Sequence, residues 1–594
     1  MQAVHHYIRL TEQLQSCVIG QSVPITSAGV ANMLCCTPRN AKLILKKLTE
    51  HNWLHWQPGR GRGHTSQLTL QIAPADLLFS LAQELVRAGD LRTATQLIEP
   101  YRSKYPALHT RYETWLSSHF GFHAADQSGT EALDTLRLTH SNPLFYLDPA
   151  IAMLRSELHV LNHIFDTLVI CDPTTAEIRP HLAHNWEISD DETCYTFYLR
   201  KGVFFHNGAP LTARDAVFSI KRLQNDSLYP WMFAGVRSIT ALNDLTLQVT
   251  LDAPNQLLLQ FFSTARASIV PEDYCTAIGA DFARLPVGSG PFKVIRNDET
   301  MLVCEAFLPY FRERALLDRI EIWIVSDLDL PVAVFEDTIK YGTASADWAT
   351  TEQLETSFQM LTCNLNKPHR PQQHLAFREA LSLLLNKRQL IADLGGDRYA
   401  PATRFDVVLE QMTTDTPSDR SQIAALLAQS GYDGEPLLLS TFGDPDHLED
   451  AMWIAETCQA AGVAITIRPL PYREMIQPEQ IAAADLILDG ATIEDNLELS
   501  YLDLFLSSCS FLAPHLSPEL RAYTARTIDN LLSQTSREAR LDLLRQIESR
   551  LLAEHVVLPL YRTWVTVSTH PLVHGVTLNS QGWVDYRNLW FRQK

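Results

Sequence analysis

The chain has 594 residues, more than the roughly 250 to 300 at which a single hydrophobic core usually stops growing. Its 46% hydrophobic and 20% charged residues are typical of globular proteins and exclude a disordered chain. No apolar run reaches the roughly 18 residues of a membrane span, and the first thirty residues lack a secretory signal pattern. We therefore expect a cytoplasmic protein of several domains, with no membrane partner.

The net charge is unevenly divided along the chain. Residues 1 to 70 contain seven basic and two acidic side chains, a net charge of +5, whereas the whole chain carries −19 and the remainder therefore −24. An acidic body with a small basic head indicates that only the head approaches a polyanion.

The chemistry-bearing residues do not form a recognisable catalytic or metal site. The ten cysteines include no Cys-x-x-Cys pair, and their pattern indicates reduced thiols. His181 and His184 are three residues apart, but without further ligands nearby they are better interpreted as hydrogen-bonding histidines. Because a His-Glu-x-x-His motif, a Gly-x-Ser-x-Gly elbow and a P-loop are also missing from the sequence, we expect neither an enzyme nor a cofactor or metal.

The basic head begins with two predicted helices. Apolar residues at helical spacing predict a first helix over residues 3 to 15. A short second helix is expected over residues 28 to 35, with Thr26 or Ser27 as its N-cap.

A third helix is expected to start at Pro38, because Thr37 is a good N-cap and proline is tolerated at the first helical position. Two short helices joined by a tight turn predict a helix-turn-helix, whose second helix enters the major groove of DNA. Arg39 and Asn40 suit bidentate pairing with guanine and adenine, and the lysines that follow suit phosphates. These lysines are Lys42, Lys46 and Lys47.

A glycine-rich loop then separates two alternating segments, residues 53 to 56 and 67 to 70, which predicts a β-hairpin wing. A small helical bundle with a solvated charged face is the alternative for this head. The candidate DNA contacts are Ser27, Thr37, Pro38, Arg39, Asn40, Lys42, Lys46, Arg60, Arg62 and His64.

Helical patterns over residues 74 to about 120 predict a connector, and from about residue 140 short strands alternate with helices, which favours an α/β body. In the body, residues 194 to 199 are expected to form a strand and residues 203 to 206 a further hairpin strand. A turn at Asn207-Gly208 follows, and Thr212 with Asp215 has capping-box spacing at the start of a helix.

The same block resembles the signature of the family 5 extracellular solute-binding proteins. Over residues 186 to 217 it contains a tryptophan, Ser-Asp-Asp, an aromatic strand, Leu-Arg-Lys-Gly, Phe-His-Asn-Gly and Leu-Thr-Ala-x-Asp-Ala-Val. Residues 286 to 292 and 377 to 383 are also similar to this family, and the resemblance covers roughly residues 140 to 594. We expect the signature aromatics to be core or hinge packing rather than ligand contacts. They are Trp186, Tyr195, Phe197, Phe204 and Phe205.

The predicted fold is multidomain: an N-terminal winged helix-turn-helix, mainly α with a β wing, followed by an α/β two-lobed periplasmic-binding-protein-like domain of the peptide-binding, family 5 type. The boundaries are residues 1–72 for the DNA-binding domain, 73–125 for the helical connector and 126–594 for the sensor domain. A winged helix in front of such a domain, and the residues 575 to 586 near the end, resemble the SgrR-like regulators.

That resemblance implies a regulator of the sugar-phosphate stress response, which activates a small-RNA gene and represses its own gene. The expected partners are operator DNA and a small-molecule effector such as a sugar phosphate, and a homodimer is compatible with the small area that one winged helix covers. The alternatives are a cytosolic solute- or peptide-binding protein without a role at DNA, and a peptide hydrolase. The ligand-contact residues were not predicted.

Overall fold

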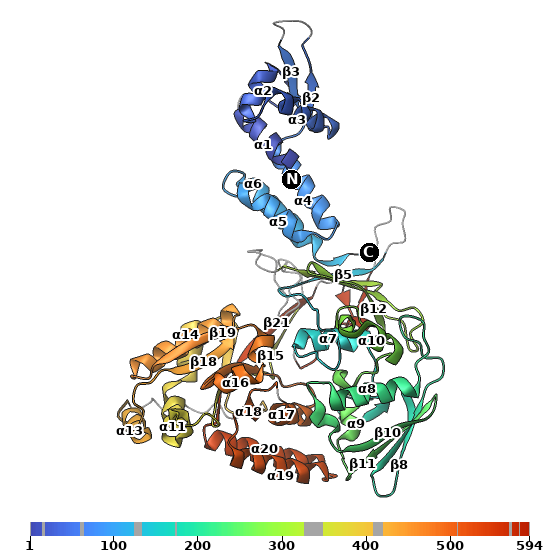
Figure 1. Ribbon diagram of the computed structural model, residues 1–594, viewed down its shortest axis with the longest axis vertical. Coiled ribbons are helices and arrows are strands. Elements are labelled where there is room, and N and C mark those ends of the chain that lie inside the picture. Colours follow the sequence, from blue (N-terminus) through green and yellow to red (C-terminus); the bar gives the residue numbers. More distant parts are fainter. Residues whose placement is uncertain are drawn as a thin grey trace.

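The computed structural model describes an elongated molecule in which a small head and a helical connector stand above a two-lobed body (Figure 1). We call residues 2–72 the head and 73–123 the connector. Lobe I comprises residues 133–325 and 573–592, and lobe II residues 349–569. The structure describes residues 2–14, 18–59, 65–123, 133–172, 175–325, 349–407, 420–507, 509–569, 573–580 and 582–592.

The head is a winged helix-turn-helix. Its helices are α1 (Gln2–Gln13), α2 (Ser27–Met33) and α3 (Pro38–Glu50), and its strands are β1 (Ser22–Ile25), β2 (Leu54–Gln57) and β3 (Ser66–Leu70). The predicted helices and the β2–β3 hairpin are present, and the sheet has the order β1-β3-β2. Strand β1 was not predicted, because its partner β3 lies more than forty residues later in the chain; the structure tolerates its Pro24 because β1 is an edge strand.

The connector consists of three helices and one short strand. They are α4 (Pro74–Arg87), α5 (Leu91–Ile98), α6 (Pro106–His119) and β4 (Gly121–His123), with a 3₁₀ turn at Glu99–Tyr101. Prolines occupy the first positions of α4 and α6, and the Asp90 carboxylate accepts a hydrogen bond from the Thr93 amide at 3.0 Å at the start of α5. The connector chain ends by pairing β4 with β5 of lobe I.

Lobe I contains a five-stranded sheet, β12-β13-β14-β5-β4, and a four-stranded sheet, β10-β11-β9-β8. Its strands are β5 (Thr135–His140), β6 (Val169–Cys171), β7 (Ile178–Pro180), β8 (Ala183–Ile188), β9 (Cys194–Leu199), β10 (Val236–Asn243), β11 (Thr246–Leu251), β12 (Phe292–Asn297), β13 (Met301–Ala306), β14 (Arg319–Ile324), β22 (Val573–His574) and β23 (Trp590–Phe591). Its helices are α7 (Arg155–Ile164), α8 (Ala213–Asn225), α9 (Leu258–Phe261) and α10 (Glu272–Ile278), with 3₁₀ turns at Pro230–Phe233, Ala265–Ala267, Gly279–Ala283 and Tyr586–Asn588.

Lobe II is built on a mixed sheet in which β15-β21-β16-β20-β18-β19 are neighbours and β17 also pairs with β21. The strands are β15 (Ala349–Leu354), β16 (Phe358–Cys363), β17 (Arg398–Pro401), β18 (Leu437–Phe442), β19 (Ile465–Leu470), β20 (Leu486–Ala491) and β21 (Val557–Thr569). The helices are α11 (Leu375–Leu384), α12 (Lys387–Leu394), α13 (Arg420–Ser430), α14 (Pro445–Ala460), α15 (Tyr472–Met475), α16 (Pro478–Ala483), α17 (Leu497–Leu506), α18 (Leu512–His515), α19 (Pro518–Leu532) and α20 (Arg537–Ala553), with a 3₁₀ turn at Pro371–Gln373.

Strands β13 and β14 of the five-stranded sheet of lobe I are buried on both faces. Along β13, Met301 and Val303 pack in the core formed with the connector helices, whereas Leu302 and Cys304 pack in the core of lobe I. This is the period of two that a strand imposes on its side chains. Two residues of α1, Val4 and Ile8, join the connector core, so that head, connector and lobe I share continuous packing.

The predicted signature block folds largely as expected. Strand β9 spans the predicted residues, and the Asp215 carboxylate accepts hydrogen bonds from the Thr212 amide and hydroxyl, both at 2.8 Å, at the start of α8. Two expectations are wrong. Residues 203 to 206 form no regular strand, because this short stretch makes one isolated bridge, between Phe204 and Pro210, and Phe204 is 41% exposed instead of core.

The remaining signature aromatics pack in the core, as expected. Tyr195, Phe197 and Phe205 are buried, and Trp186 packs against the same core with part of its ring exposed. In the part of the chain that the structure describes, no helix is both long and apolar enough to cross a membrane.

The connector contact predicts a specific loss of rigidity. Trp323 is 2% exposed, with its ring 5.4 Å from His119 and 5.9 Å from Phe120 at the end of the connector. Removing a buried tryptophan side chain costs about 3–5 kcal/mol. We expect Trp323→Ala to accelerate amide hydrogen exchange in α4 and α6 about a hundredfold or more, since those helices lose packing contacts with the sheet of lobe I. The partly exposed Trp590→Ala is the control, and equal exchange in both variants would contradict the docking.

Candidate DNA interface and interlobe cavity

The helix-turn-helix is fixed by its caps and by its turn. The Thr26 hydroxyl accepts a hydrogen bond from the Gly29 amide at 3.0 Å, and the Thr37 hydroxyl accepts one from the Asn40 amide at 3.3 Å. Thr26 is therefore the cap of α2, and Ser27 is the first residue of that helix. Between the helices Cys35 has a φ of 48°, the left-handed conformation that allows the tight turn.

Helix α3 separates a buried stripe from a cationic surface. Ala41, Ile44, Leu45 and Leu48 are buried in the head core. The predicted DNA contacts Arg39, Asn40 and Lys42 are exposed, as are Lys46 and Lys47. Lys46 also lies 3.8 Å from Glu50, a solvent-exposed pair that is too weak to hold the lysine away from a phosphate.

The other predicted DNA contacts lie around this helix. Thr37 and Pro38 are exposed at the start of α3, and Ser27 is half-buried in the first turn of α2. Arg60, Arg62 and His64 lie outside the described residues. The structure describes the part of the wing nearest the head, strands β2 and β3. Just after β2, the Gly59 amide donates a hydrogen bond to the Ser66 hydroxyl of β3 at 3.2 Å.

Sequence reasoning missed one residue of this surface. Leu43 is 58% exposed on α3, although it is apolar. The signal was available, because Leu43 is out of phase with the buried stripe of the same helix.

A cavity of about 80 Å³ lies between the two lobes. Lobe I contributes the residues around the start of α7, Tyr229 and the segment at Thr264 and Arg266. Lobe II contributes Tyr472 of α15, the end of β20 with the residues after it, one side of α17 and the segment that follows α17. The polar lining residues are Arg155, Tyr229, Thr264, Arg266, Tyr472, Asp489, Thr492, Glu494, Ser500, Asp503, Ser507 and Ser510.

Both arginines of the cavity are paired with carboxylates. Arg155 of lobe I contacts Glu355 of lobe II, the residue after β15. Arg266 lies 3.2 Å from Asp503 of lobe II and 4.3 Å from the centre of the Tyr229 ring. Each arginine therefore also links one lobe to the other.

Two further carboxylates of the cavity have raised pKa values. Burial raises the pKa of Asp489 to about 8, although the Gly490 amide and Arg155 act to lower it. Loss of solvation also raises the pKa of Glu494, and repulsion from Asp503 and Asp495 adds to the rise, although Arg266 acts to lower it. Neither group forms an ion pair with a described residue. With a pKa of about 8, Asp489 is largely protonated at neutral pH and can donate as well as accept a hydrogen bond, whereas a positively charged group beside it would favour its ionised form.

Further contacts hold the lobes together beside the cavity. Arg473 of lobe II lies 3.2 Å from Glu157 of lobe I and donates to the Ile151 carbonyl at 3.3 Å. Asn496 donates to the Gln260 side chain at 2.9 Å. The lobes are therefore in contact around the cavity, as in a closed binding protein.

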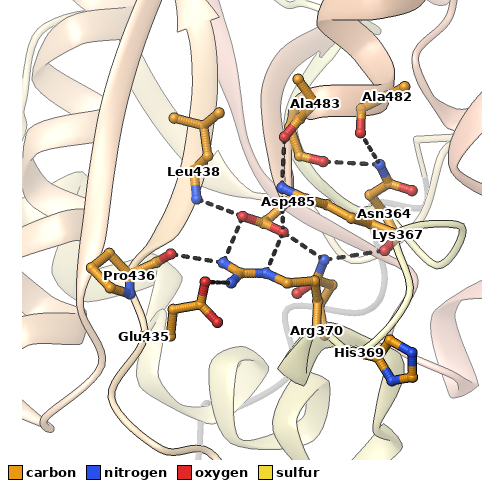
Figure 2. Close-up of polar contacts among 12 residues, drawn as sticks. Asn364, Lys367, His369, Arg370, Glu435, Pro436, Leu438, Ala482, Ala483 and Asp485 are labelled. Carbon is orange, nitrogen blue, oxygen red and sulfur yellow. Dashed lines mark hydrogen bonds and ion pairs between the residues drawn. The ribbon is translucent and has the colours of Figure 1, made fainter.

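The strongest polar cluster away from the cavity is structural. Asp485 accepts hydrogen bonds from Arg370 at 2.9 Å and from the Leu438 amide at 2.8 Å, and Lys367 lies 3.0 Å away (Figure 2). Glu435 pairs with the same arginine at 2.5 Å. Each charge here has a partner, so the cluster ties β18 and β20 to the loop after β16 and leaves no group for a ligand.

The paired histidines do not form a metal site. His181 is buried and bonds Asp166 at 2.7 Å, whereas His184 is exposed. Among the described residues, no three His, Cys, Asp or Glu side chains are placed to hold a metal ion.

Family models match both parts of the chain. Residues 177–511 match the bacterial extracellular solute-binding proteins, family 5 middle model, and residues 2–119 match the sugar transport-related sRNA regulator N-term model. The chain therefore belongs to the family 5 solute-binding proteins, with an N-terminal regulator module in front. This combination makes it an SgrR-like protein.

Full-length relatives have the same arrangement. The chain is 35% identical to the uncharacterized protein YhjP of Bacillus subtilis, over 99% of this chain and all of that protein. It is 28% identical to the HTH-type transcriptional regulator SgrR of Yersinia pseudotuberculosis and 25% identical to SgrR of Escherichia coli, in each case over 98% of both chains.

Solved structures share the fold of the body. The murein tripeptide binding protein MppA of Escherichia coli matches with a TM-score of 0.64 and 19% identity, over 80% of this chain and all of that one. The periplasmic binding protein DppA of Helicobacter pylori, in complex with the peptide STSA, matches with a TM-score of 0.64 and 18% identity, over 77% and 98% of the two chains. The two families whose models match this chain are therefore solute-binding and regulatory.

The raised pKa of Asp489 predicts a pH-dependent stability. Its pKa is about 8 in the folded protein and about 3.8 in an unfolded chain. The folded state therefore holds the proton more tightly, so this contribution to stability is fully present below about pH 3.8 and is lost progressively as the pH rises to about 8. We expect Asp489→Asn, which cannot ionise, to match the wild type closely near pH 4 and to exceed its stability increasingly above that pH, by about 3–6 kcal/mol at pH 8.5.

Thermal unfolding at several pH values measures this difference. Exposed Asp190→Asn is the matched control and should follow the wild type at every pH. A difference between Asp489→Asn and the wild type that is independent of pH would contradict the account.

Proposed function

We propose that the protein is a cytoplasmic transcriptional regulator, which binds operator DNA through its winged helix and a small solute through the cavity between its lobes. The observation that carries the proposal is the exposed cationic face of α3, mounted on an otherwise acidic chain. The match to the regulator N-term model and the full-length SgrR relatives support the same function.

The connector offers a route from solute to DNA. Because head, connector and lobe I share packed cores, the head moves with lobe I. Solute binding between the lobes would change how lobe II sits against that unit, and it can alter DNA affinity only if the solute binds the two arrangements unequally. One winged helix covers little DNA, so we propose a homodimer that reads two half-sites.

The charges of the cavity bear on the identity of the solute. A sugar phosphate is the effector that the resemblance implies. However, Arg155 and Arg266 are already paired, and a phosphate in the cavity would lie beside Asp489 and Glu494. A polar solute with an ammonium group, such as an amino acid or short peptide, fits this lining better. A rise in melting temperature with amino acids or peptides but not with glucose 6-phosphate would favour this class, and the reverse result would favour the sugar phosphate.

The second candidate is a solute-binding protein without a role at DNA, which the fold of the body alone would support. Duplex binding separates the two. We expect the full chain to bind DNA with a salt dependence set by its phosphate contacts, and Lys46→Ala to lower the slope of log K against log salt by about 1. Exposed Lys221→Ala, in lobe I, is the control and should leave the slope unchanged. If Lys46→Ala had the wild-type slope, the assignment of Lys46 on α3 to the DNA interface would be wrong. If the full chain did not bind duplex DNA at all, the second candidate function would be favoured.

A further inference from the structure

The outermost ridge of α3 contains an apolar side chain. A helix advances by about 100° per residue, so Arg39, Leu43 and Lys46 lie on the side of α3 opposite its buried stripe. Leu43 is 58% exposed at the middle of this ridge, one turn after Arg39. It therefore points where the major groove of a bound duplex would lie.

An exposed leucine alone carries no meaning, because single apolar residues are common on protein surfaces. The surroundings of Leu43 distinguish it. The rest of the ridge and its flanks are polar or cationic, with Arg39, Lys42, Lys46 and Lys47 exposed around it. The one carboxylate of α3, Glu50, is at the far end of the helix. Leu43 thus lies at the centre of the surface that attracts DNA, where water would be displaced on binding.

We infer that Leu43 is a specificity-determining residue, which reads the 5-methyl group of thymine in the major groove. The inference rests on the proposed DNA-binding function. Apolar side chains contact the thymine methyl, which is the one apolar group on the major-groove edge of a base pair. Arg39 and Leu43 are about 6 Å apart along the helix, and base pairs are about 3.4 Å apart, so the thymine is expected within about two base pairs of the base that Arg39 contacts.

Removal of the methyl group alone tests this assignment. The full chain would first select its preferred sequence from a pool of random duplexes. Each thymine of that sequence would then be replaced in turn by deoxyuridine, which lacks only the methyl. We expect one or two replacements to weaken wild-type binding about three- to tenfold. Leu43→Ala should bind the thymine duplex about that much more weakly and should be insensitive to the same replacements, whereas Leu43→Met should remain sensitive.

The variants distinguish loss of the contact with the thymine methyl from misfolding and from loss of phosphate contacts. Alanine favours helix more than leucine does and Leu43 is outside the core, so Leu43→Ala is expected to fold and to keep the wild-type salt slope. Exposed Leu308→Ala in lobe I is the matched control and should keep the wild-type sensitivity. Equal sensitivity of Leu43→Ala and the wild type to every replacement, or a selected sequence whose thymine methyls do not matter, would overturn the inference alone. A wild-type chain that binds no duplex would overturn the proposed function as well.

Discussion

The double burial of β13 and β14 in the five-stranded sheet of lobe I is the constraint on which the rest of the molecule depends. Side chains on one face of β13 and β14 form the core of lobe I, and those on the other face form a core with the connector. A sheet with two apolar faces must be covered on both, since large exposed apolar surfaces are rare in soluble monomers. In this protein the helical connector supplies the second cover (Figure 1), and strand β4 extends the same sheet.

This arrangement gives the body two different boundaries. The boundary with the connector is a continuous hydrophobic core, whereas the boundary between the lobes combines apolar packing with ion pairs such as Arg473 with Glu157 and Arg266 with Asp503. The cavity at the second boundary contains carboxylates whose burial raises their pKa values. A cationic solute would relieve that cost, so the lobe boundary is the place where binding can change the structure.

Local patterns predicted the elements well where the signal was local. The cap at Thr37, the strand at 194 to 199 and the acidic partner of Thr212 were read from neighbouring residues, and they are present. The β1 strand was missed because its pairing partner lies more than forty residues away in β3. The sequence did not single out Leu43, although its phase in α3 places it opposite the buried stripe.

The cavity could not be predicted from the sequence in the same way. Its residues come from segments as far apart as Arg155 and Ser510. Asp489 is visible in the sequence as the one carboxylate of an apolar segment, but the sequence does not show that this segment borders a cavity between two lobes. Its raised pKa results from the way the lobes and the sheet enclose it. The exposed face of α3 was easier to predict, because caps and helical periodicity fix which residues of a helix lie on its surface.

The most direct test of the account is the affinity of the full chain for its selected duplex, measured with and without a saturating solute that raises its melting temperature. If the solute acts through the lobe boundary, the duplex dissociation constant should change by about five- to a hundredfold, and the duplex should change the solute affinity by the same factor. A solute that binds tightly and leaves the duplex affinity unchanged would contradict the account, because the head and the cavity would then work independently.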